Sequence, residues 1–100
     1  MKLSELVDEF LIYLSTVRGL SDNTVVGYRN DLEQFMQFLT PEIDILTITK
    51  ENILLCVGQL SKQKKSAATI NRFIAAVRTM FSYSRKFGYI QKDPSIEIKT

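Results

Sequence analysis

The sequence predicts an all-α protein that forms a single four-helix bundle domain, and three observations support this. Apolar residues recur at three- and four-residue steps through most of the chain, which is the spacing of one helix face. Serine or threonine stands before several of these stretches as a helix cap, and glycine or proline follows them. A hydrophobic content of 45% in 100 residues suits one compact domain and excludes a disordered chain.

The first helix is expected from Ser4 to Arg18, with Ser4 as its N-cap and Gly19 as a left-handed stop. Its acidic first turns suit the positive end of the helix dipole. The residues of its apolar stripe are Leu3, Leu6, Val7, Phe10, Leu14 and Val17. All local signals therefore agree on a helix here.

The second helix is expected to begin at the N-cap Ser21 and to run to Leu39, where Thr40-Pro41 ends it. Its apolar stripe contains Val25, Tyr28, Leu32, Phe35, Met36 and Leu39. Gly27 lies inside this helix, where a glycine costs about 1 kcal/mol relative to alanine. We expect close packing against a neighbour to be the reason for it.

Residues 41 to 48 are expected to form a loop whose four apolar side chains pack on the core: Ile43, Ile45, Leu46 and Ile48. A short strand is an alternative for this loop, although no partner strand is evident. Thr49 then caps a third helix to Gln63, which buries Ile53, Val57 and Leu60.

The fourth helix is expected to start at Ser66, to run to Lys86 and to end near Gly88. Its inward residues are Ile70, Phe73, Ile74, Val77, Met80 and Phe81. Its opposite face is polar with small residues in the middle: Asn71, Arg72, Ala75, Ala76, Arg78, Thr79 and Ser82. Such a face allows a large partner to approach the helix closely.

The predicted domain covers residues 1–92, and residues 93–100, which open with Asp93-Pro94, are expected to begin a linker to a further domain. The sequence has no apolar run of the roughly 18 residues that a membrane span needs and no signal-peptide pattern. We therefore expect a cytoplasmic protein without a membrane partner. Cys56 stands in an apolar stretch, where it is expected to be a small core residue.

The composition argues against an enzyme. The chain has no histidine and one cysteine, which excludes a zinc site and a Ser/His or Cys/His arrangement. Its four glycines are scattered singly, so there is no phosphate-binding glycine loop. Neighbouring carboxylates such as Asp31 and Glu33 are expected on solvated helix faces. The sequence predicts no cofactor and no catalytic activity for this chain.

The charge is distributed unevenly along the chain. Residues 1–60 contain four Lys/Arg against nine Asp/Glu, a balance of −5, and residues 61–100 contain nine against two, a balance of +7. Such asymmetry favours a polyanionic partner at one face, although a solvated helix face explains it equally well.

Two helix starts combine chemistry that suits phosphate binding, because the first amides of a helix lack partners and the dipole adds positive charge. The candidate residues at the second helix are Ser21, Asn23, Thr24 and Arg29; those at the fourth are Lys62, Lys64, Lys65, Ser66, Thr69, Asn71 and Arg72. Taken singly, the serines are explained as simple caps and the lysines as a soluble turn. Taken together, these residues favour a binding surface.

At these two helices the sequence resembles the N-terminal core-binding, SAM-like domain of phage integrases and Xer-type tyrosine recombinases. The segment from Ser21 to Phe35 is similar to the family's second helix, with Ser, Thr, Tyr, Arg, Asp-Leu and Phe at the same spacings. The segment from Ser66 to Tyr83 is similar to its fourth helix, and Gly88 and Asp93-Pro94 follow in the family's order. Asp93 replaces the usual Asn.

A second departure is the turn before the fourth helix, where Lys64-Lys65 stand in place of a common glycine. The resemblance implies an arm of a C-shaped clamp around double-stranded DNA at a recombination core site, with the second and fourth helices crossing the major groove. The lysines and serines would hold phosphates, and Thr69, Asn71 or Arg72 would reach base edges. Other recombinase protomers are implied partners.

The resemblance also implies a separate catalytic domain with a tyrosine nucleophile, for which Tyr13, Tyr28, Tyr83 and Tyr89 are unsuited because their helix positions favour packing. The competing hypothesis is a helical protein-interaction module whose basic face meets an acidic partner. A stand-alone regulator is disfavoured, since neither helix pair has a short helix-turn-helix connection.

Overall fold

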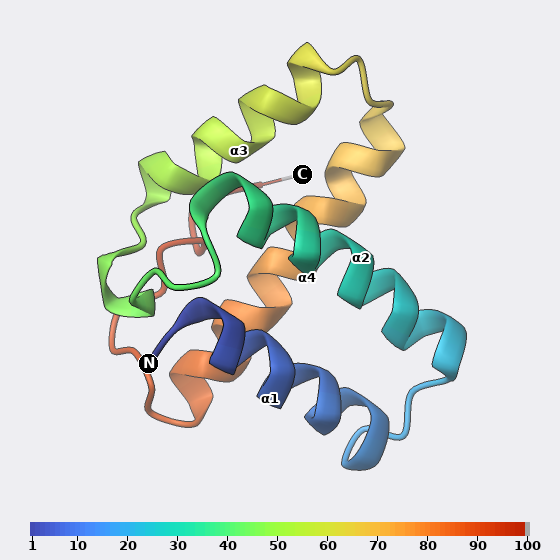
Figure 1. Cartoon of the computed structure of the whole chain (residues 1–100), viewed down its shortest axis with the longest axis vertical. Coiled ribbons are helices and arrows are strands. Elements are labelled where there is room, and N and C mark those ends of the chain that lie inside the picture. The colour runs from blue at the N-terminus through green and yellow to red at the C-terminus, as the bar shows by residue number, and fades with distance from the viewer. Residues whose placement is uncertain (100) are drawn as a thin grey trace.

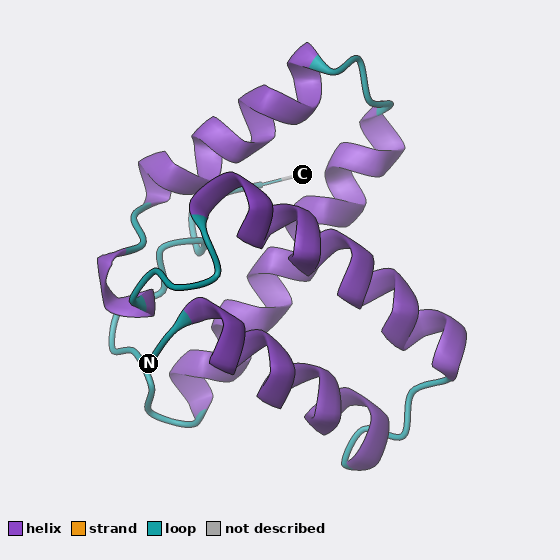
Figure 2. Cartoon of the chain, in the orientation of Figure 1, coloured by secondary structure: helices purple, strands orange, loops and turns teal. Residues whose placement is uncertain are grey.

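The computed structural model describes residues 1–99, and these form four α-helices joined by short loops (Figure 1). The helices are α1 (Leu3–Thr16), α2 (Asp22–Leu39), α3 (Lys50–Lys62) and α4 (Ala67–Lys86). A single 3₁₀ turn, η1 (Ile45–Thr47), lies in the connection between α2 and α3. The predicted all-α, four-helix fold is confirmed, and within the described residues the loop 41–48 contains an isolated bridge from Asp44 to Lys2 instead of a strand (Figure 2).

Helices α2 and α4 are the central elements of the bundle, since each of them contacts the three other helices. In Figure 1, α1 and α2 lie side by side and α4 crosses behind them, while α3 covers the opposite end. Four phenylalanines form the middle of the core, where Phe35 makes edge-to-face contacts with Phe73 and Phe81 at centroid distances of 6.0 and 6.1 Å. The predicted inward faces of α2, α3 and α4 are buried or partly buried, and Cys56 is a core residue as expected.

The start of α1 differs from the prediction because residues distant in sequence satisfy its first amides. The N–H groups of Leu3 and Ser4 donate to the carbonyls of Ile43 (2.9 Å) and Pro41 (3.0 Å). The N-cap is therefore Lys2, whose own N–H donates to Glu5 Oε1 at 2.8 Å. The expectation that Ser4 caps this helix was wrong.

Three further expectations about packing were wrong. Helix α1 ends at Thr16, so Val17 leaves the apolar stripe and is 72% exposed, while Leu11 is buried instead. In the loop, Ile45 and Ile48 are buried, but Leu46 lies on the outer side of η1 and is 68% exposed. No atom of the described residues comes within 4 Å of a Cβ built on Gly27, so close packing within this chain does not explain that glycine.

The segment after α4 packs on the domain up to Ile98. The backbone N–H and the hydroxyl of Ser95 donate to Asp93 Oδ1 at 2.8 and 2.6 Å, and both Ser95 and Ile98 are buried. An ion pair between Lys50 and Glu97 at 3.0 Å ties the segment to the start of α3. A domain boundary after residue 92 stays a prediction, and Thr100 lies outside the described residues.

Candidate nucleic-acid interface

The starts of α2 and α4 have the same cap, built from a serine and the threonine three residues later. The N–H of Thr24 donates to Ser21 Oγ at 3.3 Å, and the two hydroxyls lie 2.9 Å apart. At α4 the N–H of Thr69 donates to Ser66 Oγ at 3.1 Å, with 3.0 Å between the hydroxyls. The serines thus fulfil a capping role, and the other amides of each first turn are left for an anion.

The two helix starts lie along the same edge of the molecule but at separate points (Figure 1). The turn before α4 contains Lys64 and Lys65, follows Lys62 at the end of α3, and exposes all three side chains. Lys64 has a φ of 59°, which is the left-handed conformation. The resemblance places a glycine at this turn, and the backbone of Lys64 adopts the conformation that a glycine would favour.

A hollow of about 330 Å³ lies between the N-terminal half of α2 and the middle of α4. Three of its lining residues are small, Gly27, Ala75 and Ala76, and the remaining lining residues are Asn23, Thr24, Tyr28, Asp31 and Arg72. Three of the predicted DNA-binding residues, Asn23, Thr24 and Arg72, therefore lie together at this hollow. Asn71 is exposed beside it on α4.

Arg72 is fixed at this hollow by an ion pair to Asp31. Arg72 Nε donates to Asp31 Oδ2 at 3.1 Å, and Nη2 donates to Oδ1 at 3.2 Å. Asp31 is 6% exposed, so its position is not the solvated one that the sequence suggested, whereas 62% of the Arg72 side chain remains exposed. The pair joins α2 to α4, and the hydrogen bond that Arg72 donates to Asp31 raises the pKa of Arg72.

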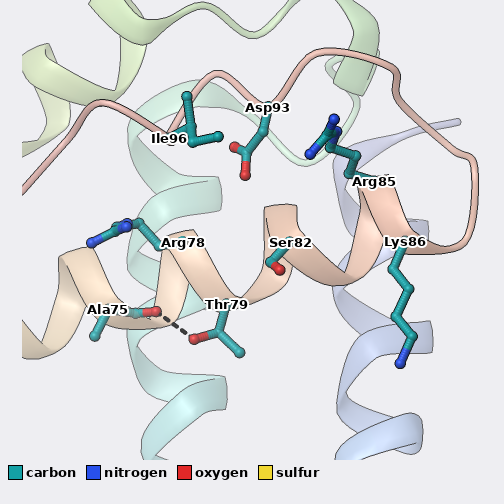
Figure 3. A pocket seen from close by; sticks show the side chains of 8 residues that line it. All are labelled: Ala75, Arg78, Thr79, Ser82, Arg85, Lys86, Asp93 and Ile96. Atoms are coloured by element: carbon teal, nitrogen blue, oxygen red, sulfur yellow. Dashed lines mark hydrogen bonds between the residues drawn. The ribbon is translucent and has the colours of Figure 1, made fainter.

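A second hollow, of about 840 Å³, follows the exposed face of α4 towards its C-terminus. Figure 3 shows that Arg78, Ser82 and Arg85 project from this face, with the carboxylate of Asp93 opposite them. Ala75 lines both hollows, which makes them neighbours on one surface. We name this surface the α2/α4 face and define it as the lining residues of the two hollows.

Arg78, Arg85 and Lys86 are not among the binding residues predicted from the sequence, although the predicted polar face of α4 extends to Ser82. Their three- and four-residue steps from Ala75 and Ser82 place them on one helix face, and this was the signal that could have found them. Arg29 is placed apart from the α2/α4 face. It lines a groove between α1 and α2, together with Asp8 and Asp22.

The tyrosines pack in the structure as expected. Tyr83 lies 4.8 Å from both Tyr13 and Phe87, centroid to centroid, and its hydroxyl donates to Glu9 at 2.6 Å. Tyr28 makes an edge contact with Phe10 at 5.8 Å. Within residues 1–99 no group of three or more possible metal ligands occurs, and none of the helices is long and apolar enough to cross a membrane.

Comparison with known proteins gives a consistent result. The family model described as "Phage integrase, N-terminal SAM-like domain" matches residues 7–87. Tyrosine recombinase XerD from Staphylococcus haemolyticus is 31% identical over 98% of this chain, and XerD from Staphylococcus aureus strain Mu50 is 32% identical over 94%. The chain covers only 34% and 32% of the lengths of these two relatives.

Two solved structures share the fold. One is a lambda integrase(75-356) dimer bound to a COC′ core site, with a TM-score of 0.87 and 18% identity over 99% of this chain and 35% of that one. The other is the N-terminal domain of the prophage pi2 protein 01 (integrase) from Lactococcus lactis, with a TM-score of 0.81 and 19% identity over 100% of this chain and 94% of that one. At these identities the likeness concerns the fold alone.

Proposed function

This chain belongs to the phage integrase N-terminal SAM-like domain family, and from that premise we propose that it is the DNA-binding arm of a tyrosine site-specific recombinase. The arm holds the recombination core site through α2 and α4, which present the α2/α4 face to the major groove. The observation that carries this proposal is the pair of adjoining hollows along α4, whose lining combines small residues with exposed arginines.

The charge of the α4 region supports a polyanionic partner. From Lys62 to Lys86 the chain contains only basic charged residues: Lys62, Lys64, Lys65, Arg72, Arg78, Arg85 and Lys86. The acidic residues concentrate in the first 60 positions, where several lie on α1 and the loops. A duplex that lies across α4 therefore meets cations along most of its contact.

The small residues that line the first hollow support close approach. Gly27 and Ala75 present no side chain beyond a methyl group, while Asn23 and Thr24, which line the same hollow, supply hydrogen-bonding groups. Base edges in the major groove offer acceptors and donors that such groups recognise. Lys64 and Lys65, which lie at the turn, would contact phosphates and carry no sequence information.

We propose that strand cleavage belongs to a separate catalytic domain, as in a C-shaped clamp whose second half supplies the tyrosine nucleophile. The two staphylococcal relatives are tyrosine recombinases, and this chain covers about one third of the length of each. In this proposal the present chain supplies binding and orientation only.

A fluorescence anisotropy titration against duplex DNA at several salt concentrations tests the DNA-arm function. Three to five phosphate contacts would give a log–log salt slope of about −3 to −4. Lys64→Ala and Lys65→Ala should each weaken binding to all sequences and reduce the slope by about 0.9. A wild-type chain that does not bind any duplex at low salt would rule out the proposed function.

A second candidate function, contact with another protomer or protein, is favoured by the groove between α1 and α2. This groove has a volume of about 570 Å³ and is lined by the exposed apolar residues Ile12 and Val26 and by the charged residues Asp8, Asp22 and Arg29. It lies apart from the α2/α4 face, so both functions are compatible. Sedimentation velocity of the wild type and of Ile12→Glu, with and without DNA, tests this second function. Self-association of the wild type that Ile12→Glu abolishes would support a contact between protomers at this groove.

A further inference from the structure

The Asp31–Arg72 pair uses one particular edge of the guanidinium group. Both carboxylate oxygens are engaged, one by Nε at 3.1 Å and the other by Nη2 at 3.2 Å. A guanidinium group has five N–H donors in a planar fork, so three remain after these two bonds. Two of the remaining donors are on Nη1 and one is on Nη2. One N–H group of Nη1 and the remaining N–H group of Nη2 point in parallel away from the side chain, and we call this side of the guanidinium group its end-on edge.

The pair is also rigid and close to neutral. Asp31 is buried on α2, so its carboxylate requires a partner, and Arg72 is the cation that supplies it. The exposed arginine is therefore already ordered before any ligand arrives. Its charge is balanced at short range, which reduces the long-range attraction of Arg72 for phosphate while its N–H donors keep their directions.

The pair borders the hollow that is lined in part by Gly27, Ala75 and Ala76. A planar group that enters this hollow meets no side chain beyond a methyl group at these three positions. The guanine edge in the major groove carries two acceptors, O6 and N7, that match two parallel donors of an arginine. A phosphate matches the same two donors, but it would bring a second negative charge close to the buried carboxylate of Asp31.

We propose that Asp31 is a positioning residue that presents the end-on edge of Arg72 to a guanine of the bound duplex. This inference rests on the proposed function and adds to it the base that is recognised and the residue that prepares the recognition. Arg72 acts as a reader of sequence in this arrangement, and Arg78 and Arg85, for which no carboxylate of the described residues lies within ion-pair distance, act as phosphate contacts.

The experiment starts with selection of preferred sites by the wild-type chain from a duplex library with a randomised centre. Selectivity is then measured as the ratio of affinities for the enriched duplex and a scrambled duplex. Arg72→Ala should reduce this ratio by about 5- to 150-fold, the range of one bidentate contact to a base. Replacement of a single guanine by 7-deazaguanine, which lacks N7, should weaken the wild type at one position and leave Arg72→Ala unaffected there.

Asp31→Asn distinguishes positioning from a structural role. This variant releases Arg72 and leaves its charge unbalanced, so selectivity should fall while affinity for the scrambled duplex stays equal or rises and the salt slope steepens. The double variant Asp31→Asn/Arg72→Ala should be no less selective than Arg72→Ala alone, because a positioning residue has no effect without the group that it positions. Thermal melts identify the variants that remain folded, and Arg72→Lys serves as a second, milder variant with the same expected loss of selectivity.

Arg78→Ala is the matched control on the same helix, and it should reduce the salt slope by about 0.9 with selectivity unchanged. Additive losses in the double variant, or a 7-deazaguanine effect that persists in Arg72→Ala, would overturn the guanine-reading pair while DNA binding itself stands. A wild type that enriches no sequence but binds all duplexes overturns the inference alone. Absence of any DNA binding overturns both the inference and the proposed function.

Discussion

The hydroxyl of Tyr83 on α4 donates to Glu9 Oε2 on α1 at 2.6 Å. This bond joins two helices that also contact each other through aromatic rings, among them Phe10 at 5.3 Å from Tyr83. The bond from Tyr83, followed by one from Tyr89, holds the pKa of Glu9 below its usual value of 4.5. The carboxylate therefore favours the folded state only while it is ionised.

The first prediction concerns the pH dependence of stability. Because the folded-state pKa of Glu9 lies below the unfolded value of 4.5, its contribution is complete above that pH and is lost as the pH falls through the folded-state pKa. Tyr83→Phe should lower the free energy of unfolding by about 1 kcal/mol near neutral pH. In urea titrations the difference between wild type and Tyr83→Phe should shrink towards zero in acid.

Glu9→Gln is the control for this prediction, since it removes the titrating group and leaves the ring packing intact. The free energy of unfolding of the double variant Tyr83→Phe/Glu9→Gln should then depend on pH in the same way as that of Glu9→Gln. A difference between wild type and Tyr83→Phe that stays constant into acid would show that the hydroxyl stabilises the fold without Glu9.

The second prediction concerns Lys64, which follows the end of α3 and has a backbone conformation that favours glycine. The N–H of Lys65 donates to the carbonyl of Leu60 at 3.1 Å and that of Lys64 donates to Ser61 at 2.9 Å, which is the bond pair of a Schellman motif. Gly88 occupies the equivalent place after α4, with a φ of 81° against 59° for Lys64. A non-glycine residue in this conformation costs about 1 kcal/mol.

Lys64→Gly should therefore raise the free energy of unfolding by about 0.5 to 1 kcal/mol, or the melting temperature by roughly 4 °C, while DNA affinity falls because a cation is lost. Lys65→Gly is the matched control. Lys65 is not in the left-handed region, so its replacement should lower both stability and affinity. Equal melting temperatures for the two variants would argue against strain at Lys64.

The features that the sequence predicted well are local ones. Ser21, Thr49 and Ser66 cap their helices as expected, because an N-cap depends on residues within three positions of it. The start of α1 was missed for the opposite reason: its amides bond to carbonyls of residues 41–43, which no short window of sequence contains. The inward faces of α2 and α4 followed from helical periodicity alone.

The candidate site was predicted as a set of residues but not as an arrangement. Asp31 and Arg72 are 41 positions apart, so the sequence around one residue does not predict its pairing with the other. The sequence around Asp31 is typical of an acidic residue on a solvated helix face. Arg29 shares a helix with Asn23 and Thr24, yet it faces the α1/α2 groove. Which residues share a face across two helices depends on the crossing of the helices, and that is a tertiary property.

The third prediction concerns Cys56, a residue that is 2% exposed. Burial raises the pKa of this thiol to about 11, so the thiolate that reacts with disulfide reagents is scarce at neutral pH. Native protein should react with an aromatic disulfide reagent far more slowly than denatured protein does, and the rate should increase with urea. Rapid reaction without denaturant would contradict the burial of Cys56.

The fourth prediction uses the two helical glycines that have open space around them. A Cβ added to Gly27 on α2 or to Gly58 on α3 meets no atom of the described residues within 4 Å. Since glycine inside a helix costs about 1 kcal/mol relative to alanine, Gly27→Ala and Gly58→Ala should each raise the free energy of unfolding by up to that amount. Chemical denaturation measures the free energy of unfolding of both variants.

The same two positions separate stability from binding when a larger side chain is introduced. Gly27→Leu fills the hollow between α2 and α4, so it should keep the fold but prevent a duplex from reaching Arg72 and Ala75. Gly58→Leu, which lines neither hollow of the α2/α4 face, should bind DNA as the wild type does. Equal binding by the two leucine variants would mean that DNA does not enter this hollow.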